Sequence, residues 1–125
     1  MPGRVTSFVV SQWSVEMEPE VEEWLESLPP VLFAVAASRV DYLADVGAST
    51  RMPRSRSLGD GLFELRFDLG RVAQRITFYF PGDRRIVLLT VFRKQRQNER
   101  AEVARARLAM RICVEQAHTA DEEER

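Results

Sequence analysis

The sequence predicts an α+β fold with a small, mainly antiparallel sheet, an N-terminal helical hairpin and a C-terminal helix. Three observations lead to this prediction. Helical spacing of apolar residues runs through positions 19–46, three β-type runs follow in close succession between 61 and 92, and helical spacing returns after residue 96. Because short turns join the three runs, neighbouring strands are expected to be antiparallel, since a parallel pair needs a long crossover.

Length and composition indicate one globular domain. The chain has 125 residues, of which 45% are hydrophobic and 30% charged, and that length suffices for a single core. We expect one domain over 1–125, with its core at about 12–114 and flexible ends at 1–7 and 115–125. The first residues lack a convincing secretory signal, and apolar runs fall short of the roughly 18 residues of a membrane helix. We therefore expect a cytoplasmic protein that does not associate with membranes.

The first predicted element is a strand over residues 12–18. Trp13, Val15 and Met17 alternate there with Ser14, Glu16 and Glu18. A period of two is typical of a half-buried strand, so the three apolar side chains are expected to share one face.

A helical hairpin is predicted next. Pro19 suits the first position of a helix, and the acidic residues that follow it suit the positive end of the helix dipole. Pro29 and Pro30 interrupt this helix, a second helical pattern runs over 31–46, and Gly47 offers a C-terminal stop. The expected apolar faces are Val21, Trp24, Leu25 and Leu28 in the first helix, and Phe33, Ala36, Ala37, Val40, Leu43 and Ala44 in the second.

Residues 48–60 are predicted to form a loop. The segment is polar, contains Pro53 and Gly59 and shows no sustained period. It carries Arg51, Arg54 and Arg56.

Three strands are predicted after this loop. In the first, Phe63, Leu65, Phe67 and Leu69 share one face, so Arg66 is expected to point away from that core. Ile76, Phe78 and Phe80 alternate in the second strand against Arg75, Thr77 and Tyr79. Pro81-Gly82-Asp83 indicates a hairpin, and residues 85–92 form a nearly continuous apolar run typical of a central strand covered on both faces.

The last predicted element is a helix that begins near Asn98, a residue suited to cap it. Its expected apolar side consists of Ala101, Ala104, Leu108 and Ile112, which fall at three- and four-residue steps. An acidic tail follows at 121–124.

Charge is distributed unevenly along the chain, although the net charge is only −1. Residues 51–111 carry fifteen basic and six acidic side chains, a net charge of +9, whereas the segments before and after carry −6 and −4. A basic middle between acidic ends indicates a face that attracts polyanions. The alternative is that these charges are scattered and solvated, since 17 of the 18 basic residues are arginines.

Several kinds of site are excluded by residue counts. Cys113 and His118 are the only cysteine and the only histidine, which rules out an intramolecular disulfide and a Cys/His zinc cluster. Cys113 is expected to be a packed thiol and His118 a solvated side chain. A Gly-rich phosphate loop is missing as well. We therefore predict that the protein uses no metal and no cofactor, and that its chemistry is cationic.

RNA is a substrate that suits such chemistry, because its 2′-hydroxyl is a nucleophile beside the bond to be cut. An enzyme can then act by alignment and by stabilising charge on the phosphate, which arginine does well. Lys94, the only lysine, is the side chain in the basic segment that we consider for proton transfer. Two alternatives remain open: Arg66 and Arg75 could pair with Glu64 or Asp68 on the surface, and residues 93–96 could be a solvated link.

Three ordered motifs resemble a known family. Gly-Leu-Phe-Glu-Leu-Arg at 61–66, Gln-Arg-Ile-Thr-Phe-Tyr-Phe at 74–80 and Ile-Val-Leu-Leu-Thr-Val-Phe-Arg-Lys at 86–94 are similar to those of HigB-type toxins in the RelE superfamily, in its phage-derived Gp49-like branch. The resemblance covers about residues 13–113. It implies a RelE-like fold and a type II toxin: a ribosome-dependent, metal-independent endoribonuclease that cuts mRNA through attack by the 2′-hydroxyl.

The resemblance also implies partners and site residues. The partners are a cognate antitoxin, usually with a helix-turn-helix domain, together with the ribosome and mRNA, and operator DNA is met only through the antitoxin. The resemblance assigns catalysis to Arg66, Arg75 and Lys94. We assign RNA binding to Arg93, Arg96, Gln97, Arg54 and Arg56.

Two departures from the family pattern bear on catalysis. Gln95 stands where the second lysine of Phe-x-Lys-Lys is expected, and the last helix holds no tyrosine. The main alternative is therefore a RelE-fold module that binds antitoxin or nucleic acid without cleaving RNA, and a purely structural subunit ranks last.

Overall fold

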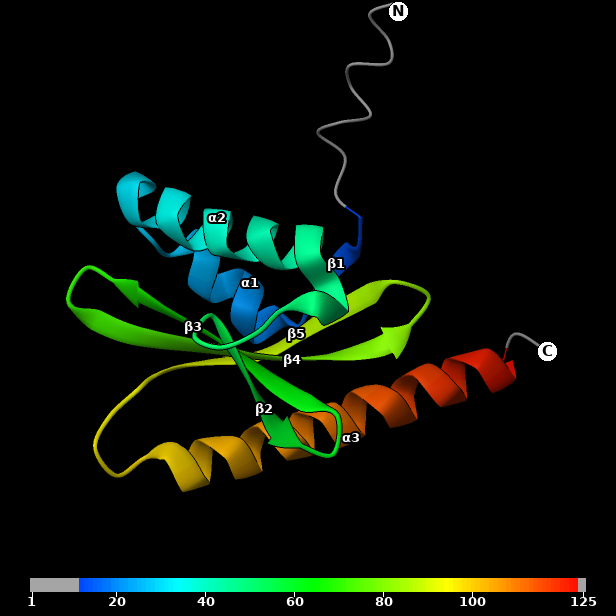
Figure 1. The fold of residues 1–125 in the computed structure, drawn as a ribbon. Helices are drawn as coiled ribbons and strands as arrows, with labels where there is room; N and C mark the ends of the chain where they lie inside the picture. The colour runs from blue at the N-terminus through cyan, green and yellow to red at the C-terminus, as the bar shows by residue number, and fades with distance from the viewer. Residues whose placement is uncertain (1–11, 124–125) are drawn as a thin grey trace, which may run out of the picture.

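The computed structural model describes the backbone of residues 12–123 and the side chains of residues 12–117. The predicted flexible end at 1–7 and the side chain of His118 lie outside this range. The fold is α+β, as predicted, with a five-stranded sheet between helices (Figure 1). In chain order the elements are β1 (Ser14–Met17), α1 (Pro19–Glu26), α2 (Pro30–Val46), the 3₁₀ turn η2 (Gly47–Ser49), β2 (Ser55–Gly59), β3 (Leu62–Leu69), β4 (Val72–Gly82), β5 (Arg85–Arg93) and α3 (Glu99–Glu123).

The sheet is mainly antiparallel and has the strand order β1-β5-β4-β3-β2. The pairs β2/β3, β3/β4 and β4/β5 are antiparallel, and the short turns between the last three strands predicted the second and third of these. β1 pairs parallel with β5, with Ser14 opposite Arg85 and Met17 opposite Leu88. α1, α2 and strands β2 to β4 lie between β1 and β5 in the chain, and they supply the long connection that a parallel pair needs.

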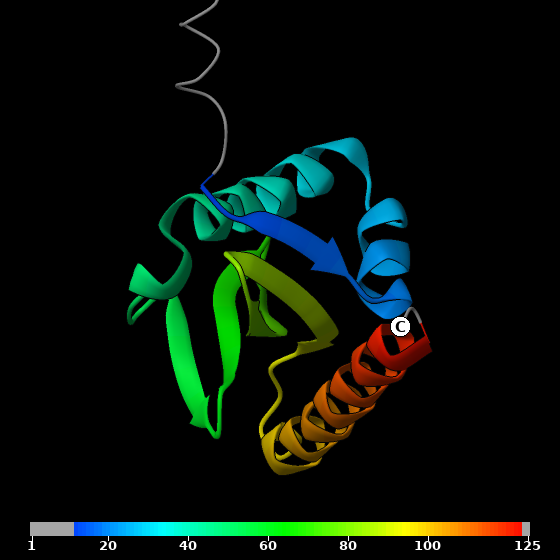
Figure 2. The same cartoon turned by 90° about the vertical axis from the view of Figure 1, so that its right-hand side faces the viewer.

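Helices cover both faces of the sheet. α1 and α2 lie on one face and α3 crosses the other, as the two views in Figures 1 and 2 show. The larger core fills the α1/α2 face, where Phe78, Leu65, Ile76 and Leu88 are fully or almost fully buried. A smaller apolar cluster lies under α3 and contains Leu62, Tyr79, Val87, Leu89 and Ala106.

The predicted loop at 48–60 is wrong for its second half, because β2 begins at Ser55. Ser55 pairs with Leu65 and Arg56 with Glu64, which adds an edge strand to the sheet. Edge strands in natural sheets are often short and polar, and this one has neither β-branched residues nor apolar alternation. The segment therefore gave no period that could predict it.

The apolar face predicted for the last helix is wrong as well. Leu108 and Ile112 are 48% and 45% exposed, and Ala104 is exposed too. The helix instead packs through Val103, Ala106 and Met110, with Ala106 fully buried. Both sides of the helix carry apolar residues, and the small Ala106 allows the close approach to the sheet. α3 also continues past residue 114, where we placed the end of the core.

Gly47 ends α2 as predicted, and the structure adds a reason for glycine at this position. Its φ of 52° lies in the left-handed region, and a Cβ atom there would lie 2.0 Å from the ring of Trp13. The ring of Trp13 therefore packs against the end of α2, 5.3 Å from the ring of Phe80.

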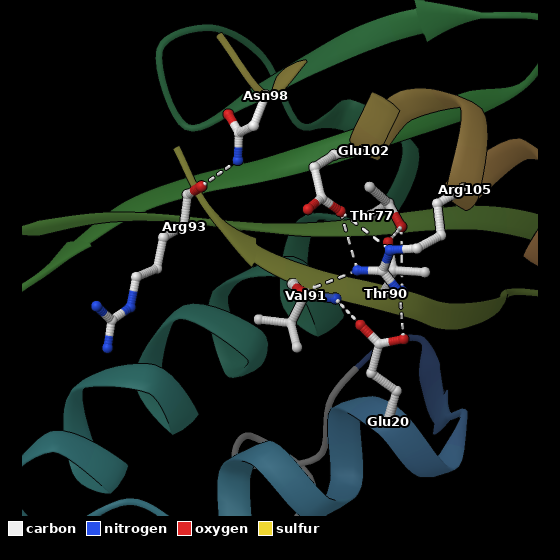
Figure 3. A network of polar contacts seen from close by, with 8 residues as sticks. All are labelled: Glu20, Thr77, Thr90, Val91, Arg93, Asn98, Glu102 and Arg105. Carbon is white, nitrogen blue, oxygen red and sulfur yellow. Dashed lines mark hydrogen bonds and ion pairs between the residues drawn. The ribbon is translucent and has the colours of Figure 1, made fainter. Parts of the chain in front are cut away.

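A polar network fixes α1 and α3 to the outer part of β5 (Figure 3). β1 ends at Met17, so the amide of Val91 lies beyond the ladder and donates to Glu20 Oε2 at 2.9 Å. Arg105 of α3 donates to Glu20 Oε1 at 2.6 Å and to Glu102 Oε1 at 3.0 Å. Charge-assisted bonds of this kind are stronger than neutral ones, and they set where α3 begins its path across the sheet.

Asn98 immediately precedes α3, but its side chain stabilises the incoming turn. Its Nδ2 donates to Arg93 O at 2.8 Å, and its Oδ1 accepts from Gln95 N at 2.9 Å. The basic turn from 93 to 98 is therefore held in one shape. None of the helices in the described residues is long and apolar enough to cross a membrane.

Candidate functional site

Arg66 and Arg75 lie directly opposite each other on β3 and β4. Glu64 lies two residues before Arg66, so all three side chains share the face of the sheet away from the larger core. Glu64 Oε2 lies 3.8 Å from the Nε atoms of both arginines, and the Glu64 side chain is 0% exposed. We call these three residues the buried triad.

The buried triad is incompletely paired. Among the described residues, neither carboxylate oxygen of Glu64 has a hydrogen-bond partner, and neither do the Nε atoms of Arg66 and Arg75. Burial raises the pKa of Glu64, against the lowering effect of Arg75 and Arg66. Burial likewise lowers the pKa of Arg75, with the neighbouring charge of Arg66 as the next cause. Uncompensated buried charge costs free energy, so the triad is a weak source of stability.

A second charged cluster adjoins the triad at the start of α3. Arg56 Nη1 and Lys94 Nζ each lie 3.7 Å from Glu99 Oε1, so one carboxylate bridges β2 and the end of β5. We call these three residues the Glu99 cluster. Counted with the triad, four cations and two carboxylates share this region, a net charge of +2.

A hollow of about 470 Å³ opens beside the triad. The pairing of β2 with β3 stops at Ser55 and Leu65, so the last part of β3 is an open edge facing α2. Arginines dominate the wall of the hollow, accompanied by an aromatic ring on α2 and one carboxylate on β3. Its lining residues are Arg39, Tyr42, Pro53, Arg54, Leu65, Arg66, Phe67, Asp68 and Arg75.

One side of the hollow is a stacked pair. The guanidinium carbon of Arg54 lies 4.6 Å from the centroid of the Tyr42 ring, a cation–π contact. The turn that carries Arg54 is anchored, because Arg54 O accepts from Arg66 N at 2.8 Å and Ser55 Oγ accepts from Thr50 Oγ1 at 2.8 Å. Both contacts hold the stacked pair at a fixed place beside β3.

A protein-family model matches residues 23–112, and its description is phage-derived protein Gp49-like (DUF891). The match spans more than half of the chain and includes the buried triad, the Glu99 cluster and the hollow. The chain belongs to the phage-derived Gp49-like family. This is a RelE/HigB-type family of toxins from toxin–antitoxin systems, which is compatible with a toxin role and implies an antitoxin partner. No curated protein and no solved structure matches the chain.

The predicted catalytic residues of this Gp49-like protein divide between the two clusters. Arg66 and Arg75 belong to the triad, and Lys94 belongs to the Glu99 cluster. The alternative in which Arg75 makes a solvated surface pair does not hold, because its side chain is only 8% exposed. Strand β4 is covered on both faces, which alternation alone did not reveal. Arg75 reaches solvent space through the hollow that it lines.

The predicted RNA-binding residues of the Gp49-like protein are spread more widely. Arg56 belongs to the Glu99 cluster and Arg54 to the hollow, while Arg96 and Gln97 are exposed in the turn before α3. Arg93 is exposed, and Figure 3 shows its side chain extending away from α3. It is therefore on the opposite side of the sheet from the contacts of Lys94 with α3.

Sequence reasoning did not assign Glu64, Glu99, Arg39 or Tyr42 to the site. Glu64 was considered as a surface partner of the arginines, and the pairing is right but the exposure is not. The available signal was the alternation of Glu64 with Arg66, which places both side chains on the same face of one predicted strand. Within residues 12–117, acidic, cysteine and histidine side chains form no group suited to a metal ion. The arrangement can hold a phosphate between guanidinium groups.

Proposed function

We propose that this Gp49-like protein is a HigB-type toxin that cuts mRNA on the ribosome, as a metal-independent endoribonuclease acting in the cytoplasm. The observation that supports the proposal most is the buried triad. Two opposed guanidinium groups beside an arginine-lined hollow form a site for a phosphate diester. The basic segment of the chain suits an encounter with ribosomal RNA, which makes association sensitive to salt.

In the proposed reaction, the 2′-oxygen attacks phosphorus and the bond from phosphorus to the 5′-oxygen of the next nucleotide breaks. The products are a 2′,3′-cyclic phosphate and a 5′-hydroxyl. Arg66 and Arg75 stabilise the negative charge that grows on the phosphate oxygens. The 2′-hydroxyl releases its proton to water, and Lys94, whose Nζ lies 3.7 Å from Glu99 Oε1, donates one to the leaving oxygen.

The sequence singled out Lys94 for proton transfer without giving the direction of transfer. The proposed reaction uses Lys94 as the acid. Its Nζ lies 3.7 Å from Glu99 Oε1, a contact that holds the end of β5 beside the start of α3.

The alternative proposal is a RelE-fold module that binds antitoxin or nucleic acid without cleavage. The replacement of the second lysine by Gln95 and the lack of a tyrosine in the final helix favour it. The missing lysine and the missing tyrosine are both groups that could transfer a proton, and their loss would leave phosphate binding by the arginines unchanged.

Purified protein incubated with ribosomes programmed with one mRNA separates the two. The toxin nuclease should give new RNA ends that carry a 2′,3′-cyclic phosphate, and the ends should not form when ribosomes are omitted. A binding module gives no new ends. The Arg66→Ala and Lys94→Ala proteins serve as controls. Each should lose cleavage while keeping its fold.

A further inference from the structure

We propose that the hollow between α2 and β3 is a nucleobase subsite, in which the base of the nucleotide next to the cut phosphate stacks on the Arg54–Tyr42 pair. The inference deepens the proposed function and rests on it for the identity of the polymer. It assigns a role to α2, whose residues Arg39 and Tyr42 line the hollow.

Size is the first argument. The hollow is about 470 Å³, and sites for small organic ligands measure about 300–1,000 Å³. A phosphate alone would leave most of this space unfilled. A nucleotide, with its phosphate at one end and its base at the other, suits the volume better.

The lining supplies the second argument, because it combines two kinds of group. Arg66 and Arg75 come from the buried triad, and their Nε atoms face Glu64 while the side chains also line the hollow. The same lining includes Arg54 and Tyr42, and the guanidinium of Arg54 lies over the Tyr42 ring. Arginine planes and aromatic rings are the surfaces on which proteins stack unpaired RNA bases.

An unpartnered donor supplies the third argument. Arg39 lines the hollow, and its Nε is buried and has no hydrogen-bond partner among the described residues. Arg75 also lines the hollow, although its Nε faces Glu64 Oε2 at 3.8 Å and its Nη1 donates to Gln74 O at 3.0 Å. A buried donor such as Arg39 Nε beside an open hollow is suited to an anionic, hydrogen-bonding ligand.

Asp68 gives the hollow a means of choosing between bases. Its carboxylate is the acidic group of the lining and accepts hydrogen bonds only. Adenine, cytosine and guanine each carry an exocyclic amino group that can donate to it, whereas uracil carries none. We therefore infer a preference against uridine at this position.

The test is an NMR titration of the purified full chain, which measures its binding of AMP, GMP, CMP, UMP and ribose 5-phosphate. Wild-type protein should bind AMP about tenfold more tightly than ribose 5-phosphate, because stacking adds to the phosphate contacts. Tyr42→Leu should reduce AMP binding to the level of ribose 5-phosphate, and Tyr42→Phe should retain it. Asp68→Asn should reduce the preference for CMP over UMP.

Phe33→Leu is the matched control, because Phe33 is an exposed aromatic residue of α2 that is not part of the hollow's lining. Its AMP binding should equal that of the wild type. If Tyr42→Leu fails to fold, Arg54→Ala makes the same comparison from the other member of the pair. Equal binding of AMP and ribose 5-phosphate by the wild type overturns the subsite, as does unchanged AMP binding by both variants.

The titration uses no ribosome and scores no cleavage, so its outcome is independent of the nuclease assay. Ring-dependent AMP binding without mRNA cleavage would overturn the proposed function and support the subsite. Cleavage by a protein that binds AMP no better than ribose 5-phosphate would overturn the subsite and support the proposed function.

Discussion

The two faces of the sheet differ sharply in what they bury. Against α1 and α2 the buried side chains are apolar, and Phe78, Ile76 and Leu88 are completely enclosed. Against α3 the apolar cluster is small, and Glu64, Thr77 and Arg75 are buried beside it. The same strands supply both faces, because successive side chains point to opposite sides.

The difference separates stability from function within one sheet. Apolar burial on the α1/α2 face stabilises the fold by roughly 25 cal/mol for each Å² removed from water. The charged groups on the α3 face carry a desolvation cost and are not fully compensated by hydrogen bonds in the described part of the chain. Variants of the apolar residues on either face should therefore affect folding, and variants of the charged groups on the α3 face should affect activity.

The largest loss of stability is expected for Phe78→Ala. Phe78 is 0% exposed and packs on Phe63 and Phe80, with ring centroids 5.6 Å away in both cases. Phe→Ala substitutions in cores cost about 3–5 kcal/mol. Urea unfolding monitored by circular dichroism measures the loss. Phe33→Ala, an exposed site on α2, should change the free energy of unfolding by less than about 0.5 kcal/mol, and equal losses would contradict the placement of the core.

A smaller loss is expected on the buried side of α3. Ala106 is fully enclosed, so Ala106→Leu should overpack the contact with the sheet and cost about 1–3 kcal/mol. Leu108→Ala, on the exposed side of α3, should cost little. Thermal unfolding of both variants tests which side of the helix packs. A larger loss for Leu108→Ala would restore the face predicted from the sequence.

Glu64→Gln should change how stability depends on pH. The raised pKa of Glu64 means that the folded state binds its proton more tightly than the unfolded state does. The stability from this group is fully present below its ordinary pKa of 4.5 and is lost as pH rises through the folded pKa. Wild-type protein should therefore lose stability relative to Glu64→Gln as pH rises from about 4.5.

Urea unfolding of both proteins at a series of pH values measures that difference. A wild-type protein that gains stability relative to Glu64→Gln over this range would show that Arg66 and Arg75 outweigh the burial of the carboxylate.

The smallest effect concerns Cys113. Burial raises the pKa of its thiol, and Tyr79 Oη donates a hydrogen bond to its Sγ at 3.2 Å. Iodoacetamide at pH 8 should therefore alkylate the native protein more slowly than the urea-unfolded chain, since the thiolate is the reactive form. Mass spectrometry follows the modification. Equal rates would show a more accessible thiol than the structure describes.

Periodicity predicted most of the fold, because β3 alternates regularly, β5 is a continuous apolar run, and the first two helices have apolar residues at helical spacing, although Phe33 of the second helix is 44% exposed. Periodicity failed where a segment had no regular apolar spacing or had apolar residues on two sides. β2 is a polar edge strand without alternation, and α3 carries apolar residues on both sides, so the sequence alone could not decide between Ala106 and Leu108. The side of the sheet on which Arg66 lies was predictable from the alternation of its neighbours on β3.

The site was less accessible to sequence reasoning than the fold. The opposition of Arg66 and Arg75 depends on the register between β3 and β4, which the sequence does not specify residue by residue. The burial of Glu64 depends on the cover above it, and the hollow depends on where β2 stops relative to β3. Tyr42 is distant in sequence from the arginines and joins them only through the packing of α2.

The most direct test of the central claim is to map 5′ ends of cellular mRNA by primer extension after brief expression of three proteins at matched abundance. These are the wild type, Arg75→Ala and Arg84→Asn. Arg84 is an exposed arginine in the hairpin at the other end of β4, and asparagine tolerates its positive φ of 55°.

We predict new 5′ ends within coding regions for the wild type and Arg84→Asn, and their loss, by about a hundredfold or more, for Arg75→Ala. New ends that persist in a folded Arg75→Ala protein would contradict the account, and so would their absence from cells that express the wild type.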